Sequence, residues 1–286
     1  MNQQLIDMIV EEVLRQIEAR GLTTAGSAVP APKSDHEDIT SPAVRSRPLL
    51  REITDSEALE RMMNATTARI GVGRCGPRLK TATMLTLRAD HAQARDAVFA
   101  DVDQKVLDSL GLFTVQSRCA DKDTYLTRPD LGRLLSDEAV NTLKEKCVPN
   151  PDVQIFASDG LSSTAIEANL PKILPVLTDA LAARGLKVGT PFYLRFGRVG
   201  AEDHVSEVLG AKVVCVLIGE RPGLATAESM SAYIVYNAYV GMPEAKRTVV
   251  SNIHRKGTAA VEAGAYIAEV IEKVLQRKAS GVDLAK

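Results

Sequence analysis

Short runs of apolar residues alternate with helical patterns along the second half of the chain. The clearest run, VVCVLI at residues 213–218, is rich in β-branched residues and lacks polar alternation, which predicts a strand covered on both faces. Three further segments have strand character: 153–157, 192–196 and 233–236. Helical patterns separate or follow them at 162–184, 202–209 and 259–278. This alternation predicts an α/β fold with a parallel, Rossmann-like sheet that is covered by helices.

Helical patterns also dominate residues 49–150. The segment 79–99 has one, and so does 137–147, where Ser136 is the expected N-cap and Glu138 lies in the first turn. In the later segment 162–184 we expect Pro171 and Pro175 to interrupt the helix, because proline lacks the backbone N–H that an α-helix needs.

The first 20 residues have an amphipathic pattern of their own. Apolar residues recur at helical spacing on one side: Ile6, Ile9, Val10, Val13, Leu14 and Ile17. The following residues are rich in Ala, Pro, Ser and Thr, a composition that buries too little apolar surface to become ordered. We therefore divide the chain into a targeting helix (1–20), a flexible linker (21–48), a mainly helical region (49–150) and an α/β region (151–286). The helix is expected to dock on a partner; the alternative is that it folds back onto the domain or pairs with a neighbour.

Composition narrows the classes of partner. The 286 residues include 35 Lys and Arg against 36 Asp and Glu, so no basic surface for nucleic acid is expected. The four cysteines are far apart and form no CxxC pair, which argues against a zinc site or a disulfide framework and favours a reducing cytoplasm. No apolar run approaches the ~20 residues that cross a bilayer.

The segment GVGRCG, residues 71–76, matches the G-x-G-x-x-G pattern of dinucleotide-binding sites. That pattern requires a strand before it and a helix after it, whereas here the preceding TTARI is short and Pro77 follows directly. We interpret the segment as a glycine turn, and a nucleotide-dependent oxidoreductase stays as the alternative function.

The segment SDGLSS, residues 158–163, follows a predicted strand and begins a helix. Asp159 and Ser162 are expected to be turn and N-cap residues, although their side chains at a strand end could also bind a ligand. There is no G-x-S-x-G motif, and His254 is expected to be structural, so neither a catalytic residue nor a metal site is predicted in this chain.

Polar residues follow three strand-like segments. They are Arg198 in RFGRVG, Glu220 with Arg221 in GERPG, and Ser251 with Asn252 in SNIH. Ligands of parallel sheets bind beyond the carboxyl ends of the strands, and the neighbouring glycines allow a bulky ligand to approach the backbone. Because no nucleophile and base accompany these residues, the site is expected to hold a ligand rather than to react with it.

Several motifs, in one order, resemble the small subunit family of ethanolamine ammonia-lyase. The segments are KDTYLTRPDLGR, NPDVQIFASDGLS, LKVGTPFYLRFGRV, LGAKVVCVLIGERPGL and SNIH. The resemblance runs from about Arg69 to the C-terminus and includes the N-terminal helix. It implies an enzyme that converts ethanolamine to acetaldehyde and ammonia with adenosylcobalamin, and a TIM-barrel large subunit that binds the substrate. It also implies an assembly with six copies of each chain. It further implies that the enzyme resides in a bacterial microcompartment, where the N-terminal helix binds the shell or the cargo.

The resemblance places Val199, Glu220 and Val249 where the family contacts cobalamin, and Arg198 is added because it precedes Val199. A carboxylate at Glu220 can accept hydrogen bonds from the amide groups around the corrin. Members of the family can carry cysteine where Val249 stands, so this position favours a backbone or packing contact. The D-x-H-x-x-G signature is missing, which implies that the cofactor keeps its dimethylbenzimidazole ligand, and His204 is interpreted as a helix-surface residue. A non-enzymatic cargo adaptor is a further alternative function.

Overall fold

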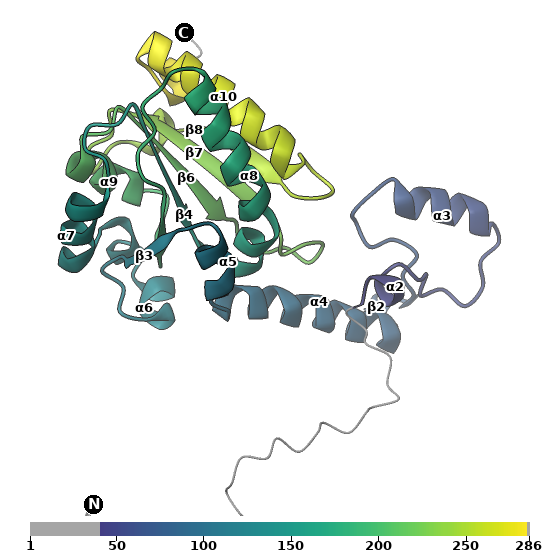
Figure 1. Cartoon of the computed structure of the whole chain (residues 1–286). Coiled ribbons are helices and arrows are strands. Elements are labelled where there is room, and N and C mark those ends of the chain that lie inside the picture. Colours follow the sequence, from purple (N-terminus) through teal and green to yellow (C-terminus); the bar gives the residue numbers. More distant parts are fainter. Residues whose placement is uncertain (1–40, 285–286) are drawn as a thin grey trace, which may run out of the picture.

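The computed structural model describes residues 41–284 and contains a six-stranded sheet with helices on both faces (Figure 1). The strand order is β3-β5-β4-β6-β7-β8, and β3, β5, β4 and β6 are mutually parallel. The strands are β3 (Phe113–Gln116), β4 (Val153–Ser158), β5 (Phe192–Arg195), β6 (Val213–Gly219), β7 (Met230–Tyr236) and β8 (Thr248–Ile253). The predicted α/β class is confirmed.

The sheet lies between helices, and an apolar layer covers each of its two faces. One face packs against α8 (Ser163–Ala183) and α10 (Ala260–Arg277), and the other against α7 (Asp137–Lys146) and α9 (Ala201–Leu209), as Figure 1 shows. All seven residues of β6 are buried, so the run at 213–218 is covered on both faces as its lack of alternation predicts. Ser136 caps α7 by accepting a hydrogen bond from the Ala139 N–H at 3.1 Å, also as predicted.

The expected parallel sheet is found for four of the six strands. β7 is antiparallel to β6, and β8 is antiparallel to β7, so the sheet is mixed. A parallel partner would need a crossover connection, usually a helix, whereas residues 220–229 between β6 and β7 contain no helix. After β6 the chain therefore turns back at the carboxyl ends of the parallel strands, and β7 pairs with β6 in the opposite direction.

The prolines of α8 do not interrupt it, contrary to the expectation. The helix is continuous over Ser163–Ala183 with Pro171 and Pro175 inside it. Each proline removes one backbone hydrogen bond, which destabilises an isolated helix. Here the apolar side of α8 is buried against the sheet and α10, and this tertiary packing offsets the missing bonds.

The region before the sheet is mainly helical, and it extends away from the sheet along α4 (Thr81–Phe99) in Figure 1. Its other elements are α3 (Ser56–Asn64), β1 (Arg74–Cys75), β2 (Arg78–Leu79), α5 (Gln104–Ser109), α6 (Lys122–Thr127) and η1 (Leu131–Arg133). Two features differ from the expectation: β3 joins the main sheet from within this region, and α2 (Pro42–Arg45) lies inside the expected linker. The predicted targeting helix at 1–20 lies outside the described residues.

Candidate functional site

The carboxyl ends of five strands, including β3, lie at the same edge of the sheet. β4, β5 and β6 are parallel, and β8 runs in the same direction because two antiparallel pairings separate it from β6. Asp159, Arg198 and Glu220 follow β4, β5 and β6 directly or closely, which brings the predicted strand-end residues to one edge. Ser251 and Asn252 differ from the prediction, because β8 continues to Ile253 and both residues lie within it.

The backbone that carries Glu220 is held by close glycine packing. A Cβ on Gly219 would lie 2.1 Å from the carbonyl oxygen of Ser162, and one on Gly160 would lie 2.3 Å from the carbonyl oxygen of Gly219. Gly160 also has a φ of +53°, a conformation that side chains disfavour. The Leu161 N–H donates to the Gly219 carbonyl at 3.0 Å, so the end of β6 is fixed against the turn that follows β4.

Glu220 is half-buried, and its carboxylate is held by a residue that the sequence reasoning missed. The hydroxyl of Tyr233 donates to Oε1 of Glu220 at 3.0 Å. Tyr233 lies in β7, where it pairs with Val216 of β6 on one side and with Val249 of β8 on the other. Burial, followed by the negative charge of Glu220, raises the pKa of Tyr233 to about 12. Tyr233 thus links Glu220 to Val249, a residue that is 45% exposed.

After β5, Arg198 and Val199 have different surroundings. The guanidinium of Arg198 stacks on the Tyr125 ring, 4.1 Å from its centroid, and donates to the Tyr125 carbonyl at 2.8 Å. The Arg198 N–H donates to the carbonyl of Gly132 in η1, also at 2.8 Å. Val199 is half-buried and packs at the margin of the apolar layer beneath α7 and α9, the layer that Tyr233 also contacts.

Asp159 has a structural role at the end of β4. Its carboxylate accepts hydrogen bonds from the Phe196 N–H at 2.8 Å and from the Lys122 ammonium at 3.1 Å. Burial raises the pKa of Asp159, and the positive charge of Lys122 opposes that shift. Ser162 is the N-cap of α8, as expected, and accepts from the Ala165 N–H at 3.3 Å. Neither Asp159 nor Ser162 lines one of the two pockets described below.

A buried ionic cluster lies at the start of α9. The guanidinium of Arg247 contacts Glu202 at 3.3 Å and Asp203 at 2.8 Å, and all three side chains are at most 5% exposed. Burial raises the pKa of Glu202 well above its usual value, although Arg247 opposes the shift. The next residue, His204, corrects our interpretation of a surface position: its Nδ1 accepts from the Leu135 N–H at 3.0 Å, and burial lowers its pKa.

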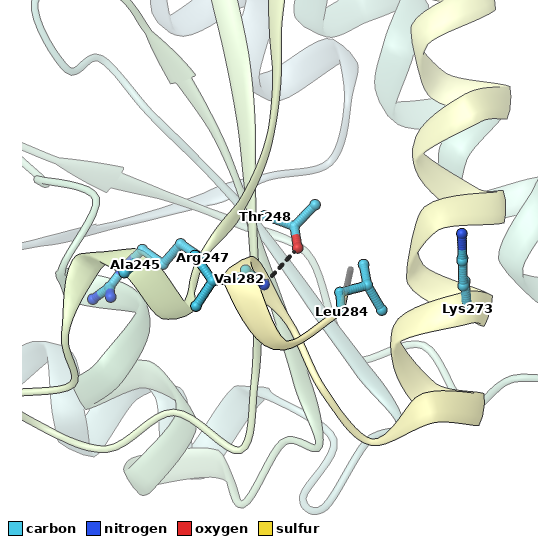
Figure 2. Close-up of a pocket in the computed structure, with 7 residues that line it drawn as sticks. Ala245, Arg247, Thr248, Lys273, Val282 and Leu284 are labelled. Carbon is cyan, nitrogen blue, oxygen red and sulfur yellow. Dashed lines mark hydrogen bonds between the residues drawn. The ribbon is translucent and has the colours of Figure 1, made fainter. Parts of the chain in front are cut away.

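The two described pockets lie apart from Glu220. One, of about 500 Å³, is formed by β8, α10, η2 (Glu244–Lys246) and η3 (Gly281–Asp283), and Figure 2 shows it. The Gly281 N–H donates to the Thr248 hydroxyl at 2.8 Å, and Figure 2 draws this hydrogen bond as a dashed line. Thr248 pairs with Ile234 of β7, which packs in the layer beneath α8 and α10, whereas Tyr233 packs on the opposite face of the sheet. The other pocket, of about 540 Å³, lies beyond β3 at Gln116–Ala120, Leu131, Ser136 and Asp137. Neither pocket contains a residue of the predicted cofactor contacts.

The GVGRCG segment does not form a dinucleotide-binding turn. Arg74 and Cys75 form β1, which pairs antiparallel with β2 in a two-stranded hairpin closed by Gly76 and Pro77. The required strand is missing before Gly71, and α4 begins only after the hairpin, so the oxidoreductase alternative gains no support. Within residues 41–284 no group of acidic, histidine and cysteine side chains could hold a metal ion. No helix in that same range is long and apolar enough to cross a membrane.

Comparison with known proteins agrees with the motifs and the fold. Residues 56–285 match the family model described as ethanolamine ammonia-lyase light chain. The chain is 56% identical over 285 residues to the ethanolamine ammonia-lyase small subunit of Fusobacterium nucleatum, covering 96% of each chain. It is 52% identical over 284 residues to that of Clostridium tetani, again with 96% of each chain covered. It is 48% identical over 282 residues to that of Clostridioides difficile, which covers 99% of this chain and 96% of the relative. The chain therefore belongs to the ethanolamine ammonia-lyase small subunit (light chain) family.

Proposed function

We propose that this chain completes the adenosylcobalamin site of an ethanolamine ammonia-lyase, the enzyme that converts ethanolamine to acetaldehyde and ammonia. As a small subunit it has a large-subunit partner. The observation that carries the proposal is the carboxylate of Glu220 at the carboxyl edge of the sheet. Its Oε1 is held by Tyr233, and Oε2 has no partner among residues 41–284. A half-buried acceptor of this kind suits a ligand with hydrogen-bond donors.

The fit of Glu220 to a corrin follows from the chemistry of the two groups. The corrin is fringed with primary amides, whose N–H groups can donate to a carboxylate in charge-assisted hydrogen bonds. The negative charge also suits the cationic cobalt centre. When bound, adenosylcobalamin supplies the radical chemistry of the reaction. Glu220 and its neighbours bind and orient it from this side, and no group of this chain is assigned a chemical step.

Val199 and Val249 supply apolar contacts on either side of Glu220. Val199 follows β5 and Val249 lies in β8, and β4, β6 and β7 stand between them. Four strand spacings amount to about 19 Å, so a ligand that touches both residues is a large one, as a macrocycle with side arms is. Arg198 contributes in another way: its guanidinium stacks on Tyr125 and donates to the Tyr125 carbonyl, so we assign it the role of holding Val199 in place.

The rest of the assembly follows from the family assignment. We infer a TIM-barrel large subunit that binds ethanolamine and faces the sheet edge at Glu220, in an assembly with six copies of each chain. We also infer that the enzyme resides in a bacterial microcompartment, with residues 1–20 docking on shell or cargo. We also infer that the α/β fold is Rossmann-like. The connections that leave β4 and β5 lead into helices on opposite faces of the sheet, which supports this inference.

The test is a cobalamin titration of the assembled enzyme. Glu220→Gln keeps the shape of the side chain and exchanges a charged acceptor for a neutral amide. Hydrogen bonds to charged groups contribute about 1.5–3 kcal/mol, which corresponds to an affinity about ten- to a hundredfold weaker. The matched control is Glu228→Gln, in the same connection between β6 and β7, whose exposed side chain should tolerate the change. Overlapping titration curves for wild-type and Glu220→Gln enzyme would remove Glu220 from the site.

A further inference from the structure

Tyr233 stands between two of the residues assigned to the cofactor. In β7 it is paired with Val249, whose side chain is nearly half exposed, and its hydroxyl donates to Glu220 Oε1 at 3.0 Å. Paired residues of neighbouring strands point to the same face of a sheet, so Tyr233 and Val249 share a face. The tyrosine ring is half-buried against the apolar layer beneath α7 and α9, which fixes the direction of its hydroxyl.

Without this contact the Glu220 side chain would have no hydrogen-bond partner among residues 41–284. A glutamate side chain has several rotatable bonds, and ordering it on ligand binding costs free energy. A hydroxyl that already holds one oxygen removes much of this cost, because the carboxylate is oriented before the ligand arrives. With its proton donated to Oε1, the hydroxyl leaves Oε2 as the free acceptor.

We propose that Tyr233 is a positioning residue, which orients the Glu220 carboxylate so that Oε2 accepts a hydrogen bond from a primary amide of the corrin. This inference rests on the proposed function and adds a second residue to the site. It makes the site selective for a donor at this point, because a carboxylate oxygen of the ligand would meet a charged acceptor of the same sign.

The experiment measures cobalamin affinity in enzyme assembled with the large subunit. Five forms are compared: wild-type, Tyr233→Phe, Glu220→Gln, the double variant of these two, and Tyr236→Phe as the control. Tyr236 lies in the same strand but packs on the opposite face, against the layer beneath α8 and α10. Binding is followed by the absorbance of the added cobalamin, and the thermal midpoint of each assembled form without cofactor is recorded in parallel.

In the wild-type background Tyr233→Phe should weaken cobalamin binding about three- to tenfold, the effect of one lost hydrogen bond. In the Glu220→Gln background the same change should weaken it less than about twofold, because the group that Tyr233 orients has already lost its charge. The kcat at saturating cobalamin and the KM for ethanolamine should stay at the wild-type values in the control Tyr236→Phe. Tyr236→Phe should bind cobalamin as the wild-type enzyme does.

Two results would overturn the inference and leave the proposed function intact. If Glu220→Gln weakens binding and Tyr233→Phe does not, the hydroxyl does not position the carboxylate. If Tyr233→Phe weakens binding equally in both backgrounds, or only lowers the thermal midpoint, it acts independently of Glu220. If neither variant changes the affinity, the assignment of Glu220 to the site fails as well, which is a failure of the proposed function.

Discussion

The ammonium nitrogen of Lys122 lies 3.1 Å from Oδ2 of Asp159, and the Asp159 carboxylate is only 2% exposed. Lys122 begins α6, whereas Asp159 follows β4 and also accepts from the Phe196 N–H after β5. One buried carboxylate therefore ties together a helix and the ends of two neighbouring strands. This contact fixes part of the sheet edge on which the proposed cofactor site depends.

Lys122→Met should destabilise the chain strongly, because it leaves the Asp159 charge buried without its cation. Breaking a buried ion pair in this way costs about 3–5 kcal/mol in the free energy of unfolding. Adding Asp159→Asn removes the unpaired charge and keeps an oxygen for the Phe196 N–H, so the double variant should be more stable than Lys122→Met alone. Urea unfolding of the three proteins measures this. If the double variant were less stable than Lys122→Met alone, the proposed cost of the unpaired Asp159 charge would be contradicted.

Gly219→Ala should damage the site through the backbone. The new Cβ would meet the carbonyl oxygens of Ser162 and Asp159 at 2.1 and 2.5 Å, so β6 must move away from the turn after β4. Overpacking typically costs about 1–3 kcal/mol, and the displaced Glu220 should also bind cobalamin less tightly. Gly223→Ala, in the same connection, is the control because its nearest neighbour atom would lie at 3.9 Å. Equal thermal midpoints for the two variants would contradict the packing argument.

Much of the fold could be predicted because apolar runs and helical patterns are local signals. The strand at 213–218 and the helix capped by Ser136 depend on residues that are close in the chain. β3 was missed because FTVQ is short and partly polar, and its place depends on pairing with β5, where Phe113 stacks on Phe192 with ring centroids 5.8 Å apart. The direction of β7 also depends on tertiary pairing.

The residues of the candidate site also differ in whether a local sequence signal or only tertiary pairing identifies them. Glu220 could be found because it follows a buried strand directly, next to glycine. Tyr233 gave no signal of its own, because a tyrosine in a strand is common. Its link to Glu220 exists only through the antiparallel register of β6 and β7, in which Tyr233 pairs with Val216. The ion cluster of Glu202 was missed for a similar reason, since its partner Arg247 is far away in the chain.

Deleting residues 1–20 should leave the deamination rate unchanged and should lower the amount of enzyme in the microcompartment. The predicted helix and most of the predicted linker precede the described residues, and the strand ends at Glu220 are built from residues that follow the linker. Fractionation of intact compartments, with the large subunit assayed in parallel, measures this. Replacing Ile9 and Val13 with aspartate provides a control of full length, because it removes only the apolar side. Normal loading of both variants would refute the docking role.

The buried cluster of Glu202, Asp203 and Arg247 should make stability depend on pH. Burial raises the folded-state pKa of Glu202 above its usual value, so the folded chain holds that proton more tightly than the unfolded chain. The stability that comes from this tighter proton binding is fully present below the pKa of Glu202 in the unfolded chain. It is lost as the pH rises through the pKa of Glu202 in the folded chain. Glu202→Gln cannot ionise and escapes this loss, so its free energy of unfolding should rise relative to wild-type as the pH increases above about 4.3, the usual pKa of a glutamate. Urea unfolding across that range measures the difference. Glu269→Gln, at an exposed position of α10, is the matched control for the substitution itself. A Glu202→Gln difference that stays constant with pH would show that the Glu202 carboxylate does not titrate in the folded chain.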